Sequence, residues 1–168
     1  LRDPEEKERK EFLQRMEEET ERLSTLIHNI LLVSRIQRFK VDYSFQWIPF
    51  SDAITEYLAE KKRKYGWADD QLVVDIATGV TVFGDWDNLK VALDNIVENA
   101  IRYSPDGFWL GVRVRVEGSM CIVSIQDRGV GIPREDQRNI FRIFYRGGRE
   151  KDRIVKGTGL GLYIVQNI

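Results

Sequence analysis

The chain has 168 residues, of which 42% are hydrophobic and 32% are charged, so it is long enough to bury a core. Its 26 basic and 27 acidic residues leave a formal net charge of −1, which excludes a global attraction to nucleic acid or to an anionic membrane. The single cysteine, Cys121, cannot form an internal disulfide and predicts a reducing, cytoplasmic location. No apolar run is long enough to cross a bilayer, so we expect membrane attachment only through segments outside this sequence.

Residues 4–38 are expected to form one long helix. No glycine interrupts this segment, and its apolar residues recur at three- and four-residue spacing. A helix of roughly 50 Å with such a seam needs a partner along its length. We therefore expect an upstream helix and a homodimer through this helix. The seam consists of Phe12, Met16, Leu23, Leu26, Ile30, Val33 and Ile36.

His28 is the only histidine, and it falls on the side of the helix opposite the seam. It is either an exposed helical residue or a nucleophile that accepts phosphate. A nucleophile would need an acidic neighbour as a base and a helix-loosening proline about one turn later. The residues that follow are Asn29, Ile30 and Leu31, which favours the exposed helical residue.

Strand and helix patterns alternate from residue 47 onward. The sequence WIPF, residues 47–50, predicts a short edge strand, because proline is tolerated only at an edge or an end. Residues 51–65 predict a helix that Ser51 or Asp52 caps. The inward face of this helix is expected to hold Ile54, Leu58 and Tyr65.

Two β-rich runs, residues 72–77 and 80–84, follow and are joined by a short Thr-Gly turn. Residues 85–104 predict another helix, which Pro105 and Gly107 end. The buried stripe of this helix is expected to consist of Leu89, Leu93, Ile96 and Ala100.

Residues 109–118 and 119–127 show the clearest hairpin pattern, because apolar and polar residues alternate along both runs. By this alternation Asp127 shares a face with Val123 and Ile125, although a carboxylate is unusual at the end of a core-facing row. The elements together predict an α/β (α+β) fold, a two-layer sandwich of a mixed sheet with helices on one face, preceded by the long helix. The core-facing residues are expected to be Leu110, Val112, Val114 and Val116 in the first run and Cys121, Val123 and Ile125 in the second.

Polar residues form a stripe beside the buried one on the helix at 85–104. Asn95, Asn99, Arg102 and Tyr103 occupy it. Two amides and a guanidinium in line can hold a hard cation such as Mg²⁺ together with the phosphates that it neutralises. The alternative is an ordinary solvated helix face.

Asp127 leaves the second hairpin strand in the sequence DRGVGIP. Gly129 and Gly131 let the backbone adopt conformations that other residues avoid and approach a flat ligand closely. The carboxylate can then accept a hydrogen bond from an exocyclic amine such as that of adenine. The alternative is a strand-to-loop turn closed by the aspartate side chain.

The sequence GTGLGLYIVQNI is a glycine-rich turn that runs into an apolar helix. Backbone N–H groups at such a start favour phosphate, although the spacing is neither that of a dinucleotide fingerprint nor that of a P-loop. The long segment before it is typical of a lid or of a solvated mobile loop. Its basic residues, which can close over a triphosphate, are Arg146, Arg149, Lys151 and Lys156.

Four sequences in this order, DNIVENAIRYS, DRGVGIP, FRIFYRG and GTGLGL, resemble the N, G1, F and G2 boxes of sensor histidine kinases. These enzymes share an ATPase superfamily with gyrase and the DNA mismatch-repair ATPases. The long first helix resembles the second helix of the dimerisation and phosphotransfer domain of these kinases. The resemblance thus covers essentially the whole chain and divides it into 1–41, an incomplete dimerisation domain, and 42–168, an ATP-binding catalytic domain.

The resemblance implies roles for individual residues. Asn99 would bind Mg²⁺, Asn95 would support the metal and the phosphates, and Asp127 would accept a hydrogen bond from the adenine amine. Arg146 would approach the γ-phosphate, so Arg146 and Asn95 are the expected catalytic residues. Phe141 would anchor the lid together with Phe144. The other implied ATP-binding residues are Arg102, Tyr103, Gly129, Gly131, Phe144, Lys156, Gly157, Thr158, Gly159, Leu160 and Gly161.

The chain also departs from the family. The acceptor histidine of the family stands before an acidic residue and a proline, and no such motif occurs here, so the acceptor is expected upstream. The last strands of the catalytic domain are expected after Ile168. Hydrolases of the superfamily carry a glutamate where Asn95 stands, so its absence favours phosphoryl transfer over hydrolysis.

The predicted function is that of a sensor histidine kinase. It would transfer the γ-phosphoryl group of ATP to a histidine and then to an aspartate of a response-regulator receiver domain. The alternatives are a superfamily ATPase that works by conformational cycling and a non-catalytic ATP-binding dimerisation module.

Overall fold

The computed structural model describes residues 4–38, 42–105, 107–147 and 157–168. The chain divides into two units, Leu1–Val41 and Asp42–Ile168. Among the described residues, no helix has the length and apolarity needed to span a membrane.

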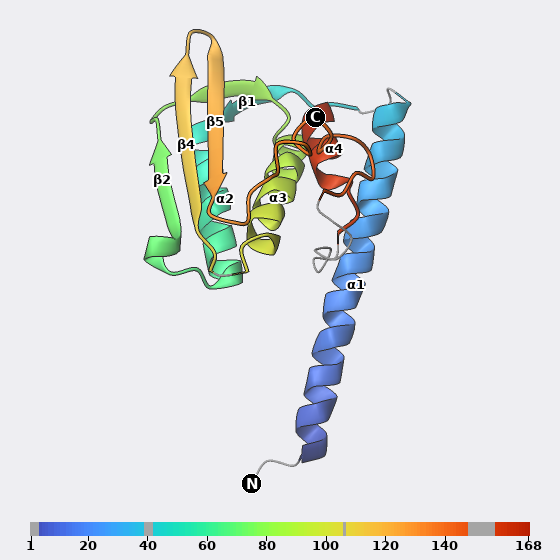
Figure 1. Ribbon diagram of the computed structural model, residues 1–168. Coiled ribbons are helices and arrows are strands. Elements are labelled where there is room, and N and C mark those ends of the chain that lie inside the picture. Colours follow the sequence, from blue (N-terminus) through green and yellow to red (C-terminus); the bar gives the residue numbers. More distant parts are fainter. Residues whose placement is uncertain (1–3, 39–41, 106, 148–156) are drawn as a thin grey trace. The chain divides into compact units, whose positions relative to one another are not determined.

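The first unit contains one continuous helix, α1 (Pro4–Gln37), as the spacing of the apolar residues predicts (Figure 1). Along much of its length the apolar seam is open to solvent, since Phe12 is 63% exposed, Leu23 58% and Ile30 55%. His28 is exposed too, in agreement with its expected place on the solvent side.

The second unit contains two small sheets. In the first, β1 (Gln46–Pro49) pairs antiparallel with β3 (Thr81–Gly84). In the second, β4 (Leu110–Glu117) lies between β2 (Leu72–Ile76), to which it is parallel, and β5 (Met120–Asp127), to which it is antiparallel. The two β-rich runs around the Thr-Gly turn therefore belong to different sheets and do not pair with each other.

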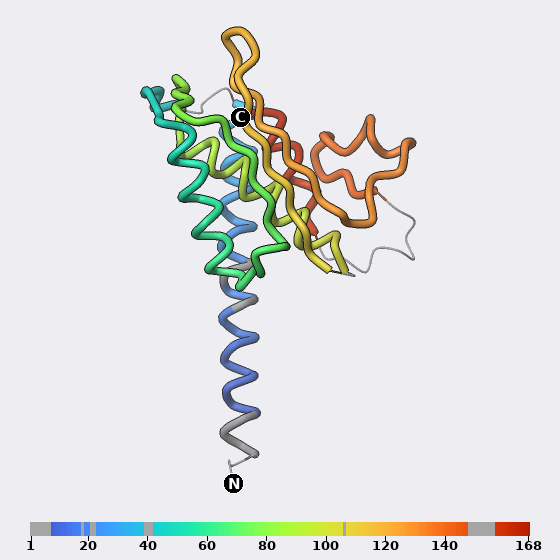
Figure 2. Tube along the Cα trace, turned by 90° about the vertical axis from the view of Figure 1, so that its left-hand side faces the viewer, coloured from blue at the N-terminus to red at the C-terminus, as the bar shows by residue number. Residues whose placement is uncertain are grey.

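Helices cover one face of these strands. They are α2 (Phe50–Tyr65), α3 (Trp86–Arg102) and the short α4 (Gly161–Asn167), with a 3₁₀ turn at Asp69–Gln71 before β2 (Figure 1). In Figure 2, which turns the left-hand side of Figure 1 towards the viewer, β4 and β5 lie in front of α3. The architecture is the predicted two-layer sandwich of mixed strands.

The core lies between these helices and the strands. Ile54 and Leu110 are completely buried, and Val97 and Val114 are 1% exposed. The alternation along the hairpin is confirmed, because Leu110, Val112 and Val114 face the core and Cys121, Val123 and Ile125 pack against it. Burial raises the pKa of the Cys121 thiol and so favours its protonated form. Val116 is the exception at 54% exposed, because it lies next to the hairpin turn.

Three expectations about the helices are wrong. No side chain caps α2, because the Ser51 hydroxyl donates to the Ala77 carbonyl at 2.7 Å and accepts from the Val80 N–H at 2.9 Å. Tyr65 is 38% exposed, since the helix ends there and its ring stacks on Trp67. Tyr57, 2% exposed, is the buried tyrosine of α2.

The third correction concerns α3. Its fully buried stripe consists of Leu93, Val97 and Ala100, whereas Leu89 and Ile96 are only partly buried. Val97 was not expected in this stripe. Leu89 and Ile96 line an apolar cavity and are therefore only partly covered, whereas Val97 joins the core cluster together with Tyr57 of α2.

Candidate functional site

The start of α3 is fixed by Asp85, the residue before the helix. One carboxylate oxygen accepts from the Asn88 N–H at 3.0 Å, and the other accepts from the Ser44 N–H at 2.7 Å. Asp85 is only 7% exposed. The hydrogen bond from Asn88, and after it the one from Ser44, outweighs the effect of burial and lowers the pKa of this carboxyl below its usual value. Asp85 thus caps α3 and ties it to the segment before β1.

A second anchor holds the middle of α3. The Asp94 carboxylate accepts from the Tyr57 hydroxyl at 2.8 Å and forms an ion pair with Lys61 Nζ at 2.6 Å. Lys61 also lies over the Tyr57 ring, 5.2 Å from its centroid. Burial, together with the neighbouring Asp94 charge, raises the pKa of the Tyr57 hydroxyl. Asp94 therefore binds α3 to α2 at the residue directly before Asn95.

Asn95 lies against the start of α4. Its Nδ2 donates to the Val91 carbonyl at 2.9 Å, which leaves the Oδ1 atom next to Gly161. A Cβ on residue 161 would stand 2.7 Å from that oxygen, closer than real Cβ contacts. Glycine at this position is thus what lets α4 approach α3 beside the amide. Asn99, one turn further along α3, is partly buried.

Asp127 is the last residue of β5, opposite Leu110 in the ladder. Its Oδ1 accepts from the Gly129 N–H at 2.8 Å, so the turn closed by the aspartate side chain does form. The carboxylate is exposed and retains its second oxygen for another donor. The turn and a ligand are therefore compatible, and the two sequence interpretations of Asp127 do not compete.

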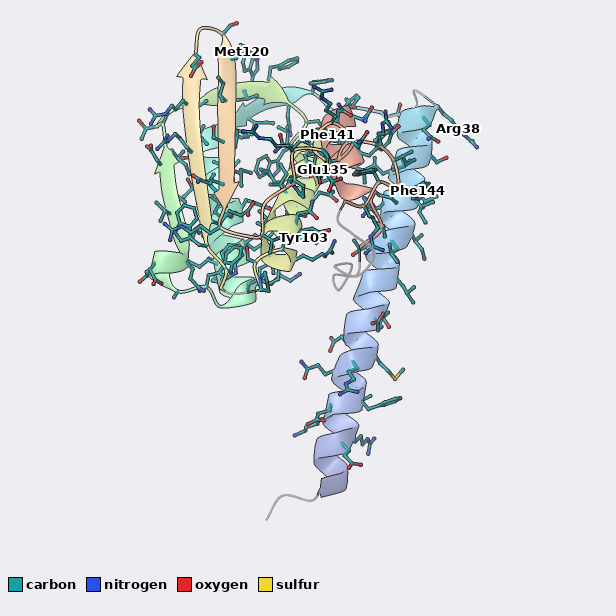
Figure 3. The ribbon with its side chains drawn as sticks, in the orientation of Figure 1. Arg38, Tyr103, Met120, Glu135, Phe141 and Phe144 are labelled. Carbon is teal, nitrogen blue, oxygen red and sulfur yellow. The ribbon has the colours of Figure 1, made fainter. Side chains whose placement is uncertain are left out.

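The loop after Asp127 is pinned to the end of α3. The Val130 N–H donates to the Tyr103 carbonyl at 3.0 Å. A Cβ on Gly129 would stand 2.4 Å from the same carbonyl oxygen, so only glycine fits there. Gly131 has a φ of 71°, in the left-handed region that glycine adopts without strain. The Tyr103 side chain is 40% exposed at the C-terminal end of α3 (Figure 3).

The glycine-rich turn meets α3 and the segment before it at two points. Gly157 lies against Arg102, whose Nη1 would be 3.4 Å from an added Cβ. Gly159, at φ 71°, packs on the Phe144 backbone, where a Cβ would stand 2.6 Å from the carbonyl carbon. Phe144 itself has a φ of 61°, a rare conformation for a residue with a side chain. Leu160 and Ile164 anchor the turn in the interior, at 1% and 0% exposed.

Most of the predicted residues are thus connected through α3. Asn95 meets Gly161, Arg102 meets Gly157, and Tyr103 meets Gly129. Arg146 and Thr158 are partly buried, whereas Phe141 and Phe144 are 36% and 65% exposed and are not buried anchors. Lys156, Arg149 and Lys151 lie outside the described residues. Sequence reasoning missed Asp85, Asp94, Lys61 and Tyr57, which hold α3 in place.

An apolar cavity of about 360 Å³ opens between α3 and β5. No predicted site residue lines it, so it belongs to the packing between the layers. Within the described ranges, no group of three His, Cys, Asp or Glu residues can hold a metal ion. The lining residues are Phe50, Leu89, Ala92, Leu93, Ile96, Val123 and Ile125.

Comparison with known proteins identifies the family to which this chain belongs. The family described as Histidine kinase-, DNA gyrase B-, and HSP90-like ATPase matches residues 84–168, which run from the end of β3 through α4. The Sensor-like histidine kinase SenX3 of Mycolicibacterium smegmatis is 31% identical over 157 residues, and the Sensor histidine kinase CpxA of Escherichia coli is 35% identical over 155 residues. The matches cover 94% and 92% of this chain but only 41% of SenX3 and 33% of CpxA.

The fold is also similar to that of a solved structure, the Acinetobacter baumannii histidine kinase AdeS. The TM-score is 0.69 at 24% sequence identity, and the match covers 91% of this chain and 69% of that one.

Proposed function

Because the chain belongs to the Histidine kinase-, DNA gyrase B-, and HSP90-like ATPase family, we propose that it is the ATP-binding part of a sensor histidine kinase. It would transfer the γ-phosphoryl group of ATP to a histidine and then to an aspartate of a response-regulator receiver domain. The similarity to SenX3 and CpxA over nearly all of this chain favours that activity over a hydrolysing ATPase or a non-catalytic module.

The observation that carries the proposal is the position of Asp127. Its turn with Gly129 fixes one carboxylate oxygen, and the contacts of Gly129 and Val130 with Tyr103 fix the loop against α3. The remaining oxygen would accept a hydrogen bond from the exocyclic amine of adenine. Gly131 would let the backbone pass close to the base, and Tyr103 would line the adenine pocket.

The phosphates would lie along α3, between Asn99 and the glycine-rich turn. Asn99 would bind Mg²⁺ and Asn95 would support it, since amide oxygens suit a hard cation that takes its other ligands from phosphate and water. Bound Mg²⁺ would neutralise the charge that develops on the phosphates. Arg102 and Arg146 would contact the phosphates from two sides, Phe144 would lie on the lid, and Lys156 would belong to the same set. The backbone of Gly157, Thr158, Gly159, Leu160 and Gly161 would form the cradle.

Asn95 also bears on the reaction type. A hydrolase needs a base that activates water, and an amide cannot accept the proton. The Asn95 side chain is further committed to the Val91 carbonyl and to the close contact with Gly161. We therefore propose phosphoryl transfer, in which Asn95 helps to position the phosphates and the Arg146 guanidinium neutralises part of their charge.

The acceptor histidine would lie on a segment outside this chain. His28 does not fit the role, because no acidic residue or proline follows it in the required pattern. The exposed seam of α1 would pair with an upstream helix and with a second copy, and make a homodimer. Catalysis would take place in the cytoplasm, with any membrane attachment supplied by other segments.

The catalytic domain would also extend beyond the strands described. One edge of β5 pairs with no other described strand, and the apolar cavity beside it opens to solvent. Further strands at this edge would cover Val123 and Ile125.

The test separates the three activities. This chain is mixed with γ-labelled ATP and a longer version that carries the upstream helix and the substitutions Asn99→Ala and Asp127→Ala. Acid-labile label on the longer chain is the expected result. Free phosphate without labelled protein would favour a hydrolase, and ATP binding with neither product would favour a non-catalytic module.

A further inference from the structure

Trp109 and Arg128 flank the hairpin end that carries Asp127. The last pair of the β4–β5 ladder is Leu110 with Asp127, and Trp109 and Arg128 are the next residues on either side of it. The Arg128 guanidinium carbon lies 4.2 Å from the centroid of the Trp109 ring. Because side chains alternate along a strand, this pair lies on the outer face of the sheet, opposite the core-facing Leu110.

The Trp109 ring packs against Gly111 of β4. A Cβ on residue 111 would stand 2.7 Å from the nearest ring carbon and 3.1 Å from the next. A larger residue at 111 would have to displace the ring, so glycine is what leaves room for the ring beside β4. The Trp109 ring thus contacts Gly111 of β4 and the guanidinium of Arg128, the residue after β5.

We propose that this stack, the Trp109–Arg128 clasp, is a positioning device for adenine recognition. The stack joins the two chain segments one residue beyond the Leu110–Asp127 pair, at the open end of the hairpin. It thereby fixes the direction in which the Asp127 carboxylate leaves the sheet. The clasp does not touch the nucleotide itself, because it lies on the other face of the strands. This inference rests on the proposed role of Asp127 and adds two residues and a supporting glycine to it.

The experiment compares the affinities for ATP and for inosine triphosphate, which carries a carbonyl in place of the exocyclic amine. Trp109→Ala and Arg128→Ala should each weaken ATP binding about two- to five-fold, the worth of a cation–π contact at an exposed site. Inosine triphosphate binding should stay unchanged, so the preference for ATP falls. Trp109→Phe keeps a ring on Gly111 and should retain most of the preference.

Gly111→Ala supplies an independent test of the geometry. It should reduce the preference for ATP as Trp109→Ala does, and it should add nothing to Trp109→Ala. Arg113→Ala is the matched control, because Arg113 lies on the same face of the same strand but pairs with Asp75 at 3.1 Å. It should leave both affinities unchanged.

The clasp is overturned if its variants keep the wild-type preference for ATP, or if they weaken both nucleotides equally. It should also have no effect on ATP binding when Asp127 is replaced by alanine. If Asp127→Ala alone leaves ATP affinity unchanged, the proposed adenine site fails. If Asp127→Ala weakens ATP binding and the clasp variants do not, only the clasp fails.

Discussion

The amide oxygen of Asn95 and the α-carbon of Gly161 approach so closely that a Cβ on residue 161 would stand 2.7 Å from that oxygen. The contact joins α3 to the start of α4, two segments that are far apart in the sequence. It places a side chain of the proposed phosphate site directly against the backbone that would cradle the phosphates.

Gly161→Ala should therefore displace the Asn95 amide and weaken ATP binding, while it destabilises the fold by only about 1 kcal/mol, the worth of the Asn95–Val91 hydrogen bond that the shift would disturb. Urea unfolding and titration with a fluorescent ATP analogue measure the two effects. Gly84→Ala is the control, because a Cβ there would meet its nearest neighbour at 3.5 Å, an ordinary contact. Equal effects of the two substitutions would contradict the close approach.

Asp127→Ala should weaken ATP binding by about 1.5–3 kcal/mol, since it removes a hydrogen bond to a charged acceptor. Isothermal titration calorimetry at fixed magnesium concentration measures the loss. Asp75→Ala on β2 changes the charge equally but removes only exposed pairs with Arg113 and Arg115. Unchanged ATP affinity in the Asp127 variant would remove this residue from the site.

Asp94→Ala should destabilise the protein by about 2–4 kcal/mol, because it leaves the buried Lys61 without its partner. Chemical unfolding measures the change. Replacing both residues, Lys61→Met with Asp94→Leu, should recover part of the stability, because the charge is removed while the buried Tyr57 hydroxyl still lacks its acceptor. Lys62→Met is the control, since Lys62 pairs with the fully exposed Asp69, and its replacement should be much less destabilising than Asp94→Ala. A double variant as unstable as Asp94→Ala would argue against the unpaired charge as the cause.

Asp85→Ala should cost about 1 kcal/mol or more at neutral pH, since it removes the cap of α3 and the bond from Ser44. The folded-state pKa of Asp85 lies below its usual value of about 4, so the stabilisation is complete above that pH. It is lost as the pH falls through the lower, folded-state pKa. The difference in unfolding free energy between wild type and variant should therefore be constant from pH 7 to 5 and shrink towards pH 2. A difference that grows on acidification would contradict this assignment.

Local patterns predicted the parts of the fold that depend on neighbouring residues. The alternation along residues 109–127 gave the hairpin and its core face, and the spacing of apolar residues gave α1 and α3. The parallel pairing of β2 with β4 had no such signal, because strands that are distant in the sequence form it. The hydrogen bonds of Ser51 with Ala77 and Val80, in the turn between β2 and β3, could not be predicted either, because they also join residues that are distant in the sequence.

The glycines of the site could be predicted from the sequence, because the backbone makes contacts there that leave no room for a side chain. Gly129, Gly159 and Gly161 each lie where an added Cβ would collide, so their spacing in the sequence reports real contacts. The residues that hold α3 in place, such as Lys61 and Asp85, had no comparable signal in the sequence. Lys61 stands in the run EKKRK, where nothing distinguishes the one buried lysine from its solvated neighbours. Asp85 was predicted only as the first residue of a helix, and its hydrogen bond from Ser44 could not be predicted because it depends on the tertiary fold.

The described residues on either side of 148–156 end at glycines with close contacts. Gly147 rests against Asp136, where a Cβ would stand 2.6 Å from a carboxylate oxygen, and Gly157 rests against Arg102. The entropy of closing a loop between two fixed ends changes only logarithmically with its length. Insertions or deletions between these two glycines should therefore be tolerated by the fold. That span contains Lys156 of the proposed phosphate site, so residues grafted before Lys156 should leave the fold intact, whereas deletion of Lys156 itself should weaken nucleotide binding.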